Sequence, residues 1–251
     1  MPPPSLYPPT QPQSISEVLN SGFTIFHTTL GRSIPYGLAA VVAAQLPNLR
    51  GLSAARTLSP LARGGPAWWT WYASGMLVSM LISSALVLRQ SALAAGRRAS
   101  LATELRTMLA RLADLIALAL FALIALTLGL ALLVVPGVYL AVPLCLAVPA
   151  LLLRPLGPLA ALICCARLVR GHWWRTALIL AVTGLVMISI YALCAMLTAF
   201  AISALGIRDL ERVAAISAAV GIAAGALAVP FFWAMMLATF AELSVRHAPG
   251  A

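Results

Sequence analysis

The chain has 251 residues, of which 62% are hydrophobic and 9% are charged, and its mean hydropathy is +1.00. A soluble domain needs roughly 25% charged residues to cover its surface, so this composition excludes an ordinary soluble protein and predicts one embedded in lipid. The formal net charge of +10 comes from 16 arginines against six acidic residues. Because the arginines separate apolar runs, they are typical of membrane topology signals, and no nucleic-acid partner is predicted.

The opening segment MPPPSLYPPTQPQ, residues 1–13, is rich in proline and has neither an apolar core nor a positive side chain. Such a segment cannot bury enough apolar surface to fold, so it predicts a short disordered tail. It also lacks the pattern of a secretory signal peptide. We expect residues 14–247 to form a single membrane domain.

Six apolar segments follow that are long enough, or nearly so, to cross about 30 Å of hydrocarbon as helices. In chain order they are 33–49, 68–88, 115–135, 138–153, 176–205 and 213–241. Pro136-Gly137 is expected to form a two-residue turn between the third and fourth, and Pro230 is expected to kink the sixth. The fifth has 30 residues, or about 45 Å as a helix, so it must tilt or protrude.

An amphipathic segment precedes the first, third and fifth spans, and apolar residues recur in each at helical spacing. The expected apolar faces are Ile15, Leu19, Gly22, Phe23, Phe26 and Leu30; then Leu101, Leu105, Met108, Leu109, Leu112 and Ile116; then Leu162, Cys165, Ala166, Val169 and Trp173. The second segment lies 86 residues beyond the first, and the third lies 57 beyond the second.

These elements predict an all-α polytopic membrane protein with six transmembrane helices and three interfacial amphipathic helices. The constant register favours a threefold helix-span-span repeat with units of about 14–90, 100–154 and 157–242. The alternative is that any helix entering a membrane looks amphipathic, in which case no repeat is present.

The arginines indicate the orientation of these spans. With six spans, both termini share one side, and that side holds eleven of the 16 arginines. The other side holds Arg50, Arg56, Arg63, Arg208 and Arg212. Since positively charged loops stay in the cytoplasm, we expect both termini to be cytoplasmic.

The stretch ARLVRGHWWRT, residues 166–176, is expected to end the third amphipathic helix and bend into the fifth span. Gly171 suits the left-handed conformation that ends many helices, and tryptophans suit the membrane interface. We expect a basic cytoplasmic face that contacts anionic lipid headgroups. The residues expected to make this contact are Arg97, Arg98, Arg106, Arg111, Arg167, Arg170, Arg175, Trp173 and Trp174.

Small residues at four-residue spacing predict close packing between helices. They are Gly75, Ser79 and Ser83 in the second span, and Ser217, Gly221 and Gly225 in the sixth. Packing within the chain is favoured over dimer formation. Prolines at 143, 149 and 155 interrupt the fourth span, which fits either a cavity beside it or a curved helix.

Side chains suited to catalysis or metal binding are not clustered in the sequence. The acidic residues Glu17, Glu104, Asp114, Asp209, Glu211 and Glu242 all fall at or outside the ends of predicted spans, which disfavours ion-coupled transport. The cysteines Cys145, Cys164, Cys165 and Cys194 form no C-x-x-C pair, so neither a metal site nor a cofactor is predicted. His172 has no carboxylate nearby in the sequence, so no catalytic role is predicted for it.

Residues 134–180 resemble the YciC-like bacterial membrane families and the membrane domain fused to some glycerophosphodiester phosphodiesterases. The matching features are Pro136-Gly137-Val138-Tyr139, Ala147-Val148-Pro149-Ala150, Gly157-Pro158-Leu159 and Arg170-Gly171 continuing to Arg175. The first amphipathic segment is also similar to that of the family. The resemblance implies a six-helix inner-membrane protein, and no phosphodiesterase domain accompanies it in this sequence.

From these features we expect an integral inner-membrane protein without catalytic activity of its own. Its expected role is membrane organisation, or accessory partner of another membrane protein, with the phospholipid bilayer as its direct contact. The alternative is a transporter of a small solute or lipid, with a cavity beside the fourth span.

Overall fold

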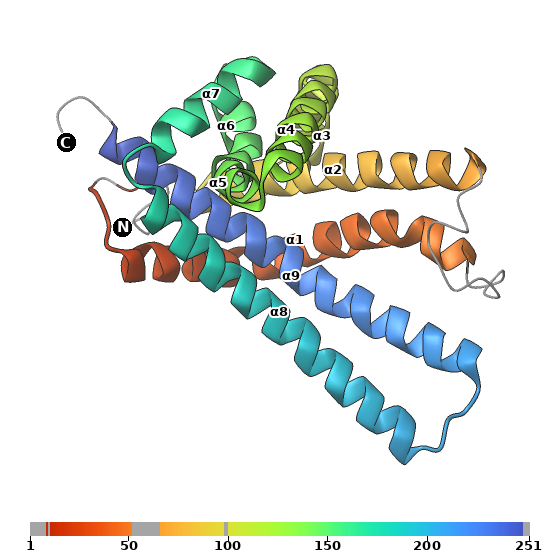
Figure 1. Ribbon diagram of the computed structural model, residues 1–251. Helices are drawn as coiled ribbons and strands as arrows, with labels where there is room; N and C mark the ends of the chain where they lie inside the picture. The colour runs from red at the N-terminus through yellow and green to blue at the C-terminus, as the bar shows by residue number, and fades with distance from the viewer. Residues whose placement is uncertain (1–8, 10, 52–65, 98–99, 248–251) are drawn as a thin grey trace. The chain divides into compact units, whose positions relative to one another are not determined.

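The computed structural model describes residues 9, 11–51, 66–97 and 100–247. These residues form nine α-helices and no strand, which confirms the predicted all-helical class (Figure 1). The helices are α1 (Ile15–Gly51), α2 (Pro66–Ala94), α3 (Leu101–Ala110), α4 (Leu112–Leu132), α5 (Val134–Cys145), α6 (Ala147–Leu153), α7 (Pro158–Val169), α8 (Trp173–Ala204) and α9 (Leu210–Arg246).

Within the described residues, five segments are long and apolar enough to cross a membrane. They are Trp68–Ala94 in α2, Leu112–Leu132 in α4, Val135–Leu153 across α5 and α6, Trp173–Ala204 in α8 and Leu210–Arg246 in α9. They match the second to sixth predicted spans and support the multi-pass membrane class. The predicted first span belongs to α1, where Arg32, Pro35 and Gln45 dilute the apolar character.

The chain divides into two compact units, which we describe separately. The first consists of residues 1–33, 84–184 and 231–251, and the second of residues 34–83 and 185–230. Helices α3 to α7 lie wholly in the first unit, whereas α1, α2, α8 and α9 each contribute residues to both units.

Helix α1 begins at a capping box. The N–H of Ser14 donates to the Glu17 carboxylate at 2.6 Å, and the N–H of Glu17 donates to Ser14 Oγ at 3.3 Å. The hydrogen bonds from Ser14 lower the pKa of Glu17. From this start α1 continues without a break to Gly51, so the first amphipathic segment and the first predicted span form one helix.

The other two amphipathic segments are separate helices, as predicted. Arg111 is a non-helical residue between α3 and α4, with φ −107° and ψ 13°. Gly171 has φ +87° and lies between Val169, the end of α7, and Trp173, the start of α8. The prediction that the residues around Gly171 bend the chain into the next long helix is confirmed.

The buried faces of the three amphipathic segments differ from the expected apolar faces. In α3, Glu104 and Met108 are buried, whereas Leu105 and Leu109 are 55% and 58% exposed. An apolar stripe does not mark the core in a membrane protein, because lipid accepts leucine as readily as the protein interior does. Gly22, Met108 and Cys165 belong to the expected apolar faces and are buried, so the pattern predicted the helices and part of the side that they bury.

The buried positions nevertheless keep one register in all three segments. Val18, Glu104 and Ala161 are buried and are separated by 86 and 57 residues, the offsets read from the sequence. The next buried set, Gly22, Met108 and Cys165, has the same separations. This shared register is what a repeat would produce.

Helices α4 and α5 form a tight hairpin. The turn is the single extended residue Leu133, with φ −169° and ψ 149°, and not the predicted Pro136-Gly137. Pro136 instead lies in the first turn of α5, where a missing N–H costs nothing. A Cβ atom on Gly129 would lie 3.1 Å from Cα of Gly137, so two glycines allow the two backbones to approach closely.

The predicted fourth span is divided between α5 and α6. Leu146, with φ −90° and ψ −5°, separates the two helices, and Pro143 lies inside α5 close to this break. Proline disrupts the helical hydrogen-bond ladder, which accounts for the interruption at this point.

Trp173, at the start of α8, contacts Tyr139 near the α4–α5 turn. The Trp173 indole N–H donates to the Tyr139 carbonyl at 3.1 Å, and the two rings stack with centroids 5.3 Å apart. Tyr139 follows the hairpin turn at Leu133 by six residues, about 9 Å along a helix. The predicted topology places that turn and the start of the fifth span at opposite faces, about 30 Å apart. In the structure the turn lies near the start of α8.

Helices α1 and α9 pack closely in the second unit, at Gly37. A Cβ atom on Gly37 would overlap the carbonyl oxygen of Ala226 and would lie 2.8 Å from Cδ of Pro230. Proline lacks the N–H that would bond a carbonyl four residues earlier in the helix. Because Pro230 cannot donate a hydrogen bond to the Ala226 carbonyl, that carbonyl remains accessible, and Gly37 lies against it. Any side chain at position 37 would overlap this carbonyl, so only glycine fits.

Candidate functional site

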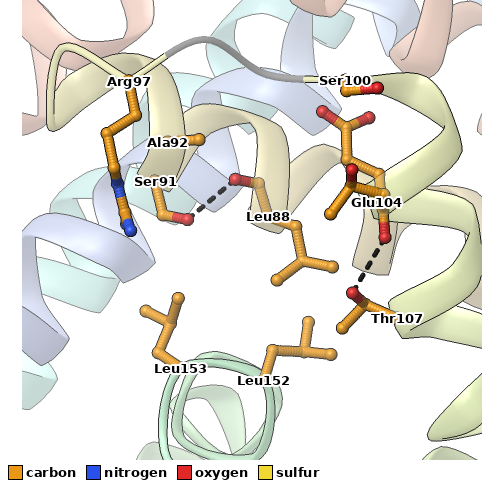
Figure 2. Close-up of a pocket in the computed structure, with 10 residues that line it drawn as sticks. Leu88, Ser91, Ala92, Arg97, Ser100, Glu104, Thr107, Leu152 and Leu153 are labelled. Carbon is orange, nitrogen blue, oxygen red and sulfur yellow. Dashed lines mark hydrogen bonds between the residues drawn. The ribbon is translucent and has the colours of Figure 1, made fainter.

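A pocket of about 370 Å³ lies in the first unit, where α2 ends, α3 begins and α6 ends. In Figure 2, Arg97 and Thr107 lie on opposite sides of the space, and Leu152 and Leu153 point into it from α6. The residues that line the pocket are Leu88, Ser91, Ala92, Arg97, Ser100, Thr103, Glu104, Thr107, Leu152 and Leu153. Charged, hydroxyl and leucine side chains thus meet in one small space.

The charges of this pocket are only partly balanced. Glu104 is buried, and its carboxylate lies 3.4 Å from the guanidinium group of Arg89. This ion pair neutralises the only acidic residue of the described lining. Arg97 is exposed and contributes a further positive charge. The described lining and its ion-pair partner therefore carry a net charge of about +1, which favours an anionic ligand.

The hydroxyl groups of the pocket retain the capacity to accept hydrogen bonds. Ser91 Oγ donates to the Leu88 carbonyl, and Thr107 Oγ1 donates to the Thr103 carbonyl, both at 2.8 Å. Each hydroxyl oxygen still has lone pairs for another donor. The side chain of Ser100 precedes α3 but does not cap it, so its hydroxyl is not held at the helix end.

Two further arginines fix helix ends beside this pocket. The Arg111 guanidinium group donates to the carbonyls of Leu151 and Arg154, at 2.6 and 3.2 Å. Carbonyls in the last turn of a helix have no partner within the helix, so Arg111 holds the end of α6. The side chain of Arg154 in turn donates to Cys164 Sγ at 3.3 Å and to Ser244 Oγ at 3.0 Å. These bonds join α6 to α7 and α9.

A second cluster of charges surrounds Glu242. Its side chain is fully buried, and Oε1 lies 3.2 Å from Arg175 Nη2 and in contact with Arg246 Nε. Both arginines also donate to the carbonyl of Gln13, Arg246 at 2.8 Å. The cluster joins the start of α8, the end of α9 and the residue just before the cap of α1.

Two histidines lie near this cluster. The rings of His172 and His247 are 5.9 Å apart. His172 Nδ1 is buried without a hydrogen-bond partner among the described residues. In that part of the chain, no three His, Cys, Asp or Glu side chains lie close enough to hold a metal ion.

The predicted headgroup contacts separate into two groups in the structure. Arg97, Arg106, Arg167, Arg170 and Trp174 are exposed, Trp174 to 82%. Arg98 lies outside the described residues.

The second group is engaged inside the protein. Arg111 binds backbone carbonyls, Arg175 binds Glu242, and Trp173 stacks on Tyr139. Their guanidinium and indole groups therefore serve helix packing and not the outward contact that the sequence predicts.

The residues predicted to pack helices together all lie in the second unit. Gly75 and Gly225 are buried, and a Cβ on Gly225 would lie 2.8 Å from Val41 Cγ2. Ser79 and Ser83 are half-buried. Ser217 and Gly221 instead line a groove of about 530 Å³ between α8 and α9.

Sequence reasoning did not predict that Glu104 and Glu242 are buried and paired with arginines. Glu242 precedes Arg246 by four residues, a spacing that brings opposite charges together on a helix. That spacing is a local signal for the Glu242–Arg246 pair. No local signal identifies Arg89 as the partner of Glu104, because the two residues belong to different helices.

The five apolar helices and the arginine-rich helix ends define a class: an all-helical protein of the multi-pass membrane type. No protein-family profile, curated protein or solved structure matches the chain.

Proposed function

We propose that this chain is a non-catalytic inner-membrane protein that contacts anionic phospholipids through a basic face. The observation that carries the proposal is the exposure of arginines beside exposed leucines on the short helices α3 and α7. Arg106 lies next to the exposed Leu105, and Arg167 lies one turn beyond the exposed Ile163. Leucines of this kind suit the acyl region, while arginines reach the headgroups.

The proposal places both termini in the cytoplasm and assigns the protein to membrane organisation or to an accessory role beside another membrane protein. The excess of arginine on one side supports this orientation through the positive-inside rule. The start of α4 and the end of α6 lie on the same side of the membrane, whether or not the turn at Leu133 reaches the opposite face. The proposed orientation therefore does not depend on that turn.

The proposal includes a threefold repeat of the YciC-like type, in which each unit contributes one amphipathic helix and a pair of apolar segments. It is supported by the shared register of buried positions at Val18, Glu104 and Ala161. The residues that resemble the family also surround the bend at Gly171, which the structure forms with a left-handed backbone.

The test is the selectivity of the protein for spin-labelled lipids in reconstituted membranes, measured by electron paramagnetic resonance. Wild-type protein is expected to immobilise phosphatidylglycerol in preference to phosphatidylcholine. In the variant Arg106→Gln/Arg167→Gln/Arg170→Gln, the preference for phosphatidylglycerol over phosphatidylcholine is expected to fall at least about threefold. The reason is that each arginine near an anionic surface contributes about 1 kcal/mol.

The matched control is Arg208→Gln/Arg212→Gln, which removes the exposed Arg208 just before α9 and the exposed Arg212 in its first turn. These residues lie on the opposite side in the proposed topology, so the preference is expected to change little. Equal losses in both variants would show that the effect follows net charge alone. An unchanged preference in the triple variant would contradict the proposed lipid contact.

The pocket beside α6 favours a second candidate function, transport of a lipid or small solute. Leu152 and Leu153 belong to the predicted fourth span, and the pocket they line also contains Arg97 and several hydroxyl groups. Transport predicts that reconstituted protein speeds movement of fluorescent lipid between leaflets of a vesicle. A rate equal to that of protein-free vesicles would contradict this candidate.

A further inference from the structure

The pocket formed by α2, α3 and α6 combines three kinds of side chain in a way that indicates its ligand. Its described lining includes one exposed guanidinium group, Arg97, and one carboxylate, Glu104, which is already paired with Arg89. A ligand with a single negative charge would balance the remaining positive charge. A phosphodiester has this charge and oxygen atoms that match a guanidinium group.

The hydroxyl groups that line the pocket point to a ligand that carries hydroxyl groups of its own. Ser100, Thr103 and Thr107 line the pocket, and the hydroxyl of Thr107 already donates to a carbonyl of its own helix. Its free lone pairs then accept from a donor on the ligand. A bare phosphate diester lacks such donors, whereas a headgroup with a glycerol or similar polyol supplies them.

The leucines place this ligand at the edge of the apolar layer. Leu88 lies near the end of the apolar segment Trp68–Ala94, and Leu152 and Leu153 end the segment Val135–Leu153. The ends of membrane-spanning segments lie at the depth where acyl chains meet headgroups. A ligand seated here therefore has its polar part among the hydroxyls and an apolar part against leucine.

We infer that this pocket binds one molecule of an anionic phospholipid with a hydroxylated headgroup. The phosphodiester binds Arg97, the headgroup hydroxyls donate to the threonine and serine oxygens, and an acyl chain lies against Leu152 and Leu153. This inference rests on the proposed function and adds to it a single, saturable site, distinct from the diffuse contact of Arg106, Arg167 and Arg170.

The test is native mass spectrometry of the full chain in detergent, with phosphatidylglycerol or phosphatidylcholine of identical acyl chains added in equal amounts. Wild-type protein is expected to retain one phosphatidylglycerol in preference to phosphatidylcholine. Arg97→Gln is expected to weaken this retention at least about tenfold, or about 1.4 kcal/mol, because it removes a charge-assisted hydrogen bond to the phosphodiester.

The matched control is Arg208→Gln, which removes an equal charge from an exposed position outside both the pocket and the basic face. It is expected to retain the single lipid as the wild type does. A second variant, Thr107→Phe, fills the pocket without changing charge and is expected to abolish the one-lipid complex. Its thermal unfolding, measured in parallel, shows whether the chain still folds, and Arg97→Gln tests the site independently of that result.

A soluble competitor distinguishes a lipid from its water-soluble headgroup. Glycerophosphoglycerol, which lacks acyl chains, is expected to displace the lipid only at concentrations far above that of phosphatidylglycerol. Displacement at equal concentration would overturn the lipid assignment and would indicate a soluble phosphodiester. Binding of several lipids without saturation at one would overturn the site itself.

The inference and the proposed function fail in different ways. If Arg97→Gln and Arg208→Gln lower retention equally while the triple variant loses lipid selectivity, the single site is wrong and the basic face stands. If Arg97→Gln alone lowers retention while the triple variant keeps its selectivity, the single site stands and the basic face is wrong. If no variant changes either measurement, both are wrong.

Discussion

Glu242 is fully buried and is held by arginines from two helices, Arg175 and Arg246. The two arginines are 19% and 24% exposed, so water screens them partly, whereas the carboxylate is removed from solvent altogether. Taking such a charge out of water is costly unless partners surround it. The cluster therefore stabilises the junction of α8 and α9 only as a complete set.

Replacing Glu242 with glutamine is expected to destabilise the protein. The substitution preserves the shape of the side chain but leaves Arg175 and Arg246 without a counter-charge, at a cost of roughly 3 kcal/mol. Thermal unfolding in detergent measures the loss. Glu211→Gln removes an exposed acid from the same helix and is the control, so equal melting temperatures for the two variants would contradict the structural role of Glu242.

Cys165 is predicted to resist alkylation in the folded protein. Burial raises the pKa of its thiol to about 12, and the neighbouring Cys164 adds to the shift. Because the thiolate is the reactive form, the thiol stays neutral and unreactive at pH 8. Mass spectrometry after iodoacetamide treatment checks this, with the half-buried Cys164 as the internal comparison. Faster modification of Cys165 than of Cys164 would contradict its burial.

At the residue scale, the sequence identified the bend at Gly171 because glycine has a backbone preference that other residues lack. It did not identify which arginines face outward. Arg106, in α3, and Arg111, at the α3–α4 junction, lie five residues apart, yet one is exposed and the other binds carbonyls at the end of α6. The partner that distinguishes them is about 40 residues away in the chain and carries no local signal.

At the scale of the element, the contact of Gly37 with α9 gives a specific test of helix packing. Gly37→Ala is expected to destabilise the protein by about 1–3 kcal/mol, because the new methyl group meets a backbone carbonyl that cannot move aside. Gly31→Ala lies in the same helix with open space around it and is expected to stabilise slightly, by up to about 1 kcal/mol. Chemical denaturation compares the two. A stabilising Gly37→Ala would contradict the close approach.

The hairpin of α4 and α5 is tested by crosslinking. In a variant without native cysteines, Tyr139→Cys/Trp173→Cys is expected to react with a short bifunctional thiol crosslinker, because the two aromatic rings are stacked. Tyr139→Cys/Trp174→Cys is the control, since Trp174 is 82% exposed. Absence of the first crosslink would instead support a turn on the opposite face of the membrane.

The lengths of α4 and α8 could be predicted closely from apolar runs, because hydrocarbon demands continuous stretches of apolar residues. The turn at Leu133 could not be predicted, since proline and glycine at positions 136 and 137 indicate a turn more strongly than leucine does. Proline fits the first turn of a helix equally well, and the close approach of Gly129 and Gly137 becomes visible only when both helices are placed. The sequence thus limits the choices of turn without deciding among them.

At the scale of the whole molecule, composition predicted a protein embedded in lipid, and the apolar runs predicted that it is all-helical. A chain with so few charged residues must expose apolar surface, and exposed side chains such as Leu128, Leu132 and Phe200 show that it does. The pocket beside α6 could not be predicted, because its lining comes from three helices. The sequence predicts Arg97 as a lipid contact and leaves open a cavity or a curved helix at the fourth span. In the structure Arg97 lines the pocket together with Leu152 and Leu153 of that span.

The central claim is that this protein gathers anionic lipid around a basic face. The measurement that tests it most directly is the lipid composition of the protein extracted with its surrounding bilayer into polymer nanodiscs. Anionic lipid is expected to be enriched over the bulk membrane for the wild type, and to return to the bulk fraction for Arg106→Gln/Arg167→Gln/Arg170→Gln. A wild-type composition equal to that of the bulk membrane would contradict the claim.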